Sequence, residues 1–195
     1  SCEIDCLIFF NMNNIRYLSG FTGSDGILIV SNNRTVLLVD GRYITQANLE
    51  AADTEIFQYK DKIRGIVEAV NELNLKYIGF EAESVVVQMY NLLIRELPDK
   101  VFVPVGEELR LLRAYKDEAE ITIMRKAAQI SSAAVLALKS EIKFGYSEKE
   151  LALQLETIAR KSGAEQLAFE TIFASGENSA LPHATPTDRK IKRGD

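Results

Sequence analysis

Histidine and cysteine are scarce in this 195-residue chain, and tryptophan is absent. The only histidine is His183, and the only cysteines are Cys2 and Cys6. Two cysteines are too few for a secreted domain held together by disulfides. Cys6 opens an apolar run typical of a strand, on which the two thiols would lie too far apart to pair. One histidine and two cysteines are also too few for a closed structural zinc site, so we expect free thiols in a reducing cytoplasm.

Long apolar runs and an excess of basic residues are also missing. No apolar run approaches the ~20 residues that span a bilayer, and no signal peptide is visible. Lys and Arg number 23 against 28 Asp and Glu, a net charge of −5. Binding to a phosphate backbone requires the opposite balance, and the basic cluster at 189–193 is more typical of a solvated turn. The sequence therefore predicts a cytoplasmic protein with no nucleic-acid and no membrane partner.

What is present is the pattern of an α/β domain in the first half of the chain. Polar residues 31–34 separate two apolar runs and predict a hairpin. Single helices, expected over 43–52, 61–74 and 84–97, separate the other runs, with Asp40 and Ser84 as candidate caps. The hairpin and the crossovers together predict a mixed sheet covered by helices. The expected strands are 4–10, 26–30, 35–39, 54–59, 76–80 and 101–105.

The second half has longer helices and a different organisation. A long helical pattern starts at Asp117, carries small alanines at helical spacing, and is expected to end at Gly145. Ser147 and Glu150 form a capping box for a second helix, with Gly163 placed to stop it. The sequence pattern predicts a strand over residues 169–174 and a loop over 175–188. One strand without a partner cannot satisfy its backbone, so either it pairs with another chain or the sequence is a fragment of a longer protein, and the fragment is favoured. We expect a domain boundary near residues 111–117.

Three motifs carry possible chemistry. Three glycines within 20–26 could cradle a phosphate, but a hairpin follows where a helix would be required, so a structural turn is favoured. Arg42, after Asp40, could reach a carboxylate in a substrate or in a salt bridge, and the structural interpretation is again favoured. His183 lies in a loop bounded by two prolines and could hydrogen-bond a substrate or move a proton. For a lone histidine a surface role is favoured, and no serine is marked as a triad partner.

Four segments, in order along nearly the whole chain, carry a family resemblance. They are Asn14-Ile15-Arg16-Tyr17-Leu18-Ser19-Gly20-Phe21-Thr22-Gly23-Ser24, then Asp40-Gly41-Arg42-Tyr43 with Gln46-Ala47, then Leu112-Arg113-Ala114-Tyr115-Lys116 with Glu120-Ile121, and finally Phe169-Glu170-Thr171-Ile172-Phe173-Ala174-Ser175-Gly176 with Asn178-Ser179-Ala180-Leu181-Pro182-His183-Ala184. With these motifs the chain resembles the Xaa-Pro aminopeptidase and prolidase family, whose relatives include creatinase.

The resemblance implies two domains and a metal-dependent activity. A creatinase-like N-terminal α/β domain with a mixed sheet would span 1–113, and residues 114–195 would begin an incomplete pita-bread α+β domain. The family removes an N-terminal residue that precedes proline, using two metal ions held by two Asp, one His and two Glu. Hard ligands suit manganese, with cobalt or zinc as alternatives. All five ligands would lie beyond Asp195, so the fragment itself would carry no metal and would be inactive.

The resemblance carries one active-site role to this chain, a substrate contact for His183. It also implies a homodimer acting on proline-containing peptides. Two rival interpretations stay open, a non-catalytic interaction module of the same fold and a creatinase-like amidinohydrolase with a metal-free site. Two Asp, one His and two Glu in the parent sequence beyond Asp195 would favour the peptidase.

Overall fold

The structure, a computed structural model, describes residues 4–195, which form two compact units. Unit 1 extends to Tyr115 and unit 2 runs from Lys116 to Asp195. This division lies beside the domain boundary that the sequence predicts between residues 113 and 114. Cys6 is a buried free thiol, and Cys2 lies outside the described residues.

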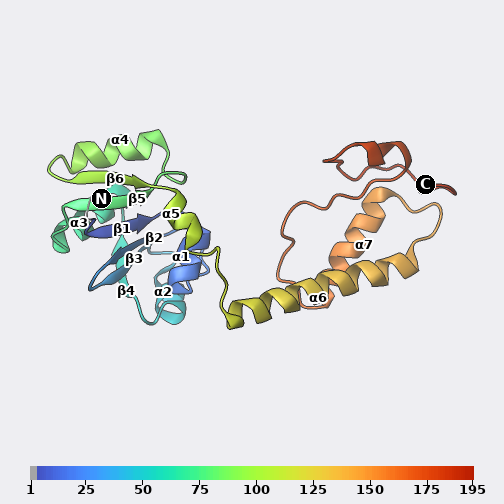
Figure 1. The fold of residues 1–195 in the computed structure, drawn as a ribbon, viewed down its shortest axis with the longest axis horizontal. Coiled ribbons are helices and arrows are strands. Elements are labelled where there is room, and N and C mark those ends of the chain that lie inside the picture. Colours follow the sequence, from blue (N-terminus) through green and yellow to red (C-terminus); the bar gives the residue numbers. More distant parts are fainter. Residues whose placement is uncertain (1–3) are drawn as a thin grey trace. The chain divides into compact units, whose positions relative to one another are not determined.

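Unit 1 is built on a six-stranded mixed sheet with the order β4-β3-β2-β1-β5-β6 (Figure 1). The pairs β1–β2 and β2–β3 are antiparallel, whereas β1–β5, β3–β4 and β5–β6 are parallel. The predicted α/β fold with a mixed sheet is therefore confirmed. The strands are β1 (Cys6–Phe9), β2 (Ile27–Ser31), β3 (Thr35–Asp40), β4 (Glu55–Tyr59), β5 (Tyr77–Glu81) and β6 (Val101–Val105).

Helices cover both faces of this sheet. Successive side chains of a strand point to opposite faces, and in the central strands the side chains on both faces are apolar, so both faces need a covering layer. On β2, Ile27 and Ile29 face one hydrophobic core, and Leu28 faces the other. The first core packs against α3 (Lys62–Glu72) and α4 (Val87–Glu96), as Figure 1 also shows. The second packs against α1 (Met12–Ser19), α2 (Ile44–Glu50) and α5 (Glu107–Leu111).

Residues 20–26, with the three glycines, form an irregular loop, in agreement with the structural interpretation of this segment. Helix α1, which was missed in the sequence, directly precedes the loop and ends at Gly20, a residue in the left-handed region at φ +79°. The start of α1 depends on a distant residue. The buried carboxylate of Glu81 accepts hydrogen bonds from the backbone N–H groups of Phe10 and Asn11 at 2.6 and 2.7 Å. The side chain of Asn11 also caps α1 locally, because its Oδ1 accepts the N–H of Asn13 at 2.9 Å. This cap was overlooked in the sequence, and the contact with Glu81, 71 residues away, leaves no local signal. The short helix α5 was missed as well.

Neither of the two predicted caps in unit 1 is formed. Helix α4 begins after Val86, without a side-chain cap, while Ser84 donates its backbone N–H to the carbonyl of Glu81. Asp40 accepts hydrogen bonds from Arg42 instead of capping α2. Asp40 is the last residue of β3, and Ser84 lies in the turn that follows β5. In such turns local hydrogen bonding competes with helix capping.

Unit 2 starts with α6 (Glu118–Glu141) and α7 (Glu148–Lys161), each opened by a capping box. The boxes pair Asp117 with Glu120 and Ser147 with Glu150, as predicted for the second. Helix α6 ends at Glu141, before the predicted stop. Gly163, at φ +102°, follows the end of α7 as expected.

The strand predicted for residues 169–174 is wrong. This stretch is irregular, and the short 3₁₀ helix η1 (Gly176–Ala180) follows it. An apolar run forms a strand only where a second strand completes its hydrogen bonds. Within the described part of unit 2, the only β-type pairing is a single bridge between Ser147 and Lys190. That bridge holds the chain end against the start of α7.

Helix α6 is long and apolar enough to cross a bilayer, by length and composition alone. Its most apolar window has a mean hydropathy of 1.2, and 11% of that window is buried. The sequence predicts this helix but does not mark it as a candidate span, because Arg125 and Lys126 interrupt its apolar residues. A core helix of a soluble protein can pass the same test, so the absence of a membrane partner stays a prediction.

Candidate active site

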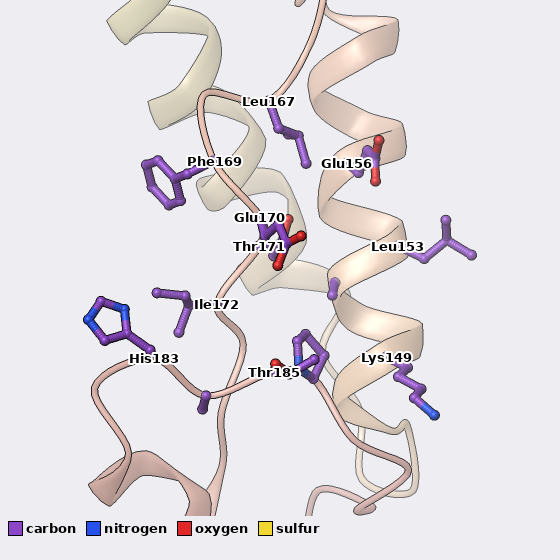
Figure 2. A pocket seen from close by; sticks show the side chains of 13 residues that line it. Lys149, Leu153, Glu156, Leu167, Phe169, Glu170, Thr171, Ile172, His183 and Thr185 are labelled. Carbon is purple, nitrogen blue, oxygen red and sulfur yellow. The ribbon is translucent and has the colours of Figure 1, made fainter. Parts of the chain in front are cut away.

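A cavity of about 720 Å³ in unit 2 contains His183 in its wall (Figure 2). Helix α7 supplies one side through Lys149, Ala152, Leu153 and Glu156. The spacing of three and four residues places these positions on one face of the helix. The irregular segments 167–172 and 183–186 form the remainder. A helix that begins at a capping box therefore supplies a regular wall to a cavity otherwise made of loops.

His183 lies on the loop side of this cavity, next to Ile172 and Phe169 in Figure 2. Its imidazole is exposed and makes no hydrogen bond to any residue within 4–195. The adjacent Ala184 is buried, at 5% exposure, and donates its N–H to the carbonyl of Leu181 at 3.3 Å. Ala184 therefore anchors the loop, while both ring nitrogens of His183 stay available to another molecule.

Both ends of the loop that carries His183 are bonded to one buried carboxylate, that of Glu148. Glu148 is 0% exposed and is the first residue of α7. Its Oε1 accepts the backbone N–H and the hydroxyl of Ser175, at 2.7 and 2.8 Å. Its Oε2 accepts the backbone N–H and the hydroxyl of Thr187, at 3.0 and 2.6 Å. The amide of Asn178 reaches both oxygens at 3.1 Å.

These donors keep Glu148 ionised although it is buried. Burial acts to raise the pKa of its carboxyl, but the hydrogen bonds from Thr187 and Ser175 outweigh burial and lower the pKa from 4.5 to about 2. A buried carboxylate needs such donors, because leaving it without partners would cost far more than the individual bonds contribute.

A second ionic contact fixes the last residues of the chain. Arg189 donates two hydrogen bonds to Asp195, at 2.6 and 2.9 Å, and a third to the hydroxyl of Ser175 at 2.8 Å. The backbone N–H of Lys192 adds a bond to Asp195 at 2.8 Å. The hydrogen bond from Arg189, followed by that from Lys192, lowers the pKa of Asp195 to about 2. Both oxygens of Asp195 are therefore engaged within this chain.

The matches to known proteins follow the two units. Residues 2–115 match the Creatinase/Prolidase N-terminal domain, and residues 122–195 match Metallopeptidase family M24. This chain belongs to the creatinase/prolidase family. The predicted family is therefore confirmed, and with it the creatinase-like domain followed by part of the M24 peptidase domain.

Individual members of the creatinase/prolidase family match almost the whole chain. The "Uncharacterized peptidase YqhT" of Bacillus subtilis is 34% identical over 98% of this chain and 55% of its own length. The structure of an Xaa-Pro dipeptidase from Bacillus anthracis matches with a TM-score of 0.89 and 35% identity, covering 97% of this chain and 53% of the other. The structure of an X-Pro aminopeptidase from Thermotoga maritima matches with a TM-score of 0.89 and 38% identity, covering 98% of this chain and 56% of the other. The chain thus spans about half the length of these relatives.

M24 is a family of metallopeptidases, so the question arises whether residues of this chain could hold a metal ion. In the part of the chain that the structure describes, no three His, Cys, Asp or Glu side chains come together as metal ligands would. Asp195, the acidic residue closest to the expected ligands, is already bonded to Arg189. The residues within 4–195 do not fit a metal site on their own.

The remaining predicted residues have structural roles. Arg42 forms a salt bridge with Asp40 at 2.7 Å and lies over the ring of Tyr43, in agreement with the structural interpretation. Lys190 of the basic cluster pairs with Glu150 at the surface, as expected of solvated charge. Arg189 departs from that expectation, because its side chain is 18% exposed and pairs with the largely buried side chain of Asp195.

Glu148 is the site residue that sequence reasoning missed. It lies inside the recognised capping box, where an acidic residue is common for helix-dipole reasons, so nothing local marks it. Its partners Ser175 and Thr187 are 27 and 39 residues away in the chain. The one available signal was the pair of hydroxyl residues Ser175 and Thr187, which delimit the loop around His183 and each need a hydrogen-bond acceptor.

Proposed function

We propose that this chain is the first half of an exopeptidase that removes an N-terminal residue preceding proline. Its relatives include proteins named Xaa-Pro dipeptidase and X-Pro aminopeptidase. The observation that carries the proposal is the position of His183, which lines the cavity within the segment that matches the M24 family. The creatinase-like unit, by contrast, contains no comparable arrangement of a free imidazole beside a cavity in the part described.

His183 is proposed as a substrate contact. An imidazole without an internal partner can donate to, or accept from, a polar atom of a bound peptide. Ile172 and Phe169, beside it in Figure 2, offer apolar surface to a side chain or a proline ring. Apolar walls beside the single imidazole suit recognition of a short peptide near the bond that is cleaved.

The metal centre belongs to the remainder of the parent protein in this proposal. Two divalent cations, with manganese the first choice and cobalt or zinc as alternatives, would be held by two Asp, one His and two Glu after Asp195. Such ions supply an activated water and polarise a carbonyl. This chain's own residues would bind and orient the peptide, so the 195-residue chain alone is expected to be inactive.

Homodimerisation and a cytoplasmic location complete the proposal. Exposed apolar side chains of unit 2, among them Leu136 and Phe144, give a physical reason for association. Size-exclusion chromatography that gives a monomer at all concentrations would contradict the dimer.

The test of the proposed function is a hydrolysis assay of the full-length parent. After EDTA treatment and reloading with manganese, it should cleave an Xaa-Pro dipeptide and leave the matched Xaa-Ala dipeptide intact. Failure to cleave either peptide would favour the non-catalytic module, and hydrolysis of creatine would favour the amidinohydrolase. Cleavage by the isolated 195-residue chain would contradict the expected inactivity.

A further inference from the structure

The two oxygens of Glu148 divide their hydrogen bonds between two segments. Oε1 holds Ser175, which directly precedes η1, and Oε2 holds Thr187, which follows the proline that ends the loop. Asn178 connects the two sides, because its amide contacts both oxygens and lies 3.3 Å from the Thr187 hydroxyl. One carboxylate thus bridges the beginning and the end of the loop that contains His183.

Inside the loop, three backbone bonds are formed, from Asn178 to Ser175 at 3.1 Å, from Leu181 to Asn178 at 3.0 Å and from Ala184 to Leu181 at 3.3 Å. Arg189 adds one side-chain bond, to the Ser175 hydroxyl at 2.8 Å, but within the described residues only the Glu148 side chain is bonded to both ends of the loop. Closing a loop of this length costs conformational entropy, which the bonds at its ends must offset. The strongest of those bonds are charge-assisted and converge on Glu148.

Glu148 also connects the loop to the opposite wall of the cavity. It is the first residue of α7, and the cavity-lining positions from Lys149 to Glu156 follow on the same helix. The backbone N–H groups of Glu148 and Lys149 donate to the carbonyls of Arg189 and Thr187, both at 3.1 Å. The start of α7 therefore fixes the distance between the wall and the loop.

We infer that Glu148 is a positioning residue, which sets the place of the His183 imidazole relative to the α7 wall by holding both ends of the loop. This inference rests on the proposed function only for its catalytic consequence. The geometric part concerns this chain alone and is testable without activity. Loss of the bridge should release the loop while α7 keeps its capping box, because Ser147 and Glu150 form that box without Glu148.

The single histidine makes the geometric test direct. In a ¹H–¹³C correlation spectrum of the 195-residue chain, the imidazole signal belongs to His183 alone. In Glu148→Gln this signal should move toward the random-coil position and narrow as the loop gains motion. The matched control is Glu118→Gln, because Glu118 occupies the same position after a capping box on α6 but is exposed. Its His183 signal should coincide with that of the wild type.

A second variant covers the case in which Glu148→Gln fails to fold. Thr187→Val removes one hydroxyl donor to Glu148 and keeps the shape of the side chain. It should shift the same signal in the same direction by a smaller amount. A His183 signal unchanged in whichever of these variants folds overturns the inference.

Kinetics of the full-length protein separate this inference from the proposed function. If Glu148→Gln displaces the His183 imidazole, kcat should fall by about 10²-fold with little change in KM. If wild type cleaves Xaa-Pro peptides and Glu148→Gln keeps its kcat, positioning is overturned and the function stands. If wild type cleaves none, the function fails, and the His183 signal alone decides the positioning.

Discussion

At the scale of single residues, buried groups with shifted pKa values give the clearest testable predictions. Glu148 is the main case, because its pKa lies well below that of the same carboxyl in an unfolded chain. A group whose pKa is lowered by folding stabilises the folded state above its unfolded pKa. That contribution is lost as the pH falls toward its folded pKa.

Acid should therefore destabilise unit 2 through Glu148. The expected window lies between the ordinary pKa of 4.5 and the folded value of about 2. In urea melts at a series of pH values, the unfolding free energy of wild type should decrease across this window, and Glu148→Gln should show a shallower decrease. Equal slopes for the two proteins would contradict the role of Glu148, since the lowered carboxyls of Glu150 and Asp195 are present in both.

The thiol of Cys6 should be protected from alkylation. Burial, and to a lesser degree the nearby Asp5, raises its pKa to about 12, so the reactive thiolate is rare. Iodoacetamide treatment at mildly alkaline pH, followed by peptide mass spectrometry, should find Cys6 unmodified in the folded protein and modified in urea. Equal modification in both conditions would contradict its burial.

At the scale of elements, the first turn of α7 should depend on its cap. Ser147→Ala removes the hydroxyl that accepts from the N–H of Glu150 and should destabilise the protein by about 1 kcal/mol. The matched control is Ser131→Ala, in an exposed position within α6, where alanine has the higher helix propensity. Chemical denaturation measures both changes, and a loss equal in the two variants would show that the cap is not the cause.

The turn at Gly176 is the second test at this scale. Gly176 has φ +50°, and a Cβ there would meet the guanidinium of Arg189 and lie 2.9 Å from a carboxylate oxygen of Asp195. Gly145, at φ +90°, has open space where a Cβ would lie, with no atom within 4 Å, so alanine there isolates the backbone cost. Gly145→Ala should cost roughly 1–2 kcal/mol. Gly176→Ala should cost more, measured by the same denaturation, and an equal cost would contradict the close packing.

Elements whose signals are local were predictable, and those that depend on distant contacts were not. The hairpin around Ser31 and the capping box at Ser147 were found because both are formed by neighbouring residues. Helix α1 was missed although Asn11 caps it, because the other support of its start is Glu81, at the end of the neighbouring strand β5 and 71 residues away in the chain. The run at 169–174 was assigned to a strand on its composition, although strand formation also requires a partner.

At the scale of the whole molecule, the same distinction applies to the site. His183 was found through a family motif and its prolines, and the structure adds that it lines a cavity. Glu148 was not found, because its role appears only when α7 meets the segments around Ser175 and Thr187. The motifs thus identify the peptidase family, while the support of the loop is a property of the folded unit.

The central claim is that His183 is a substrate-contacting residue of an Xaa-Pro exopeptidase. Its most direct test is kcat/KM for an Xaa-Pro dipeptide with the manganese-loaded full-length protein, comparing wild type with His183→Ala and with Ser179→Ala, an exposed control in the same loop. Wild type and Ser179→Ala should cleave the peptide equally well, and His183→Ala should lose about 10²-fold or more. Equal values for all three proteins, or no cleavage by wild type, would contradict the account.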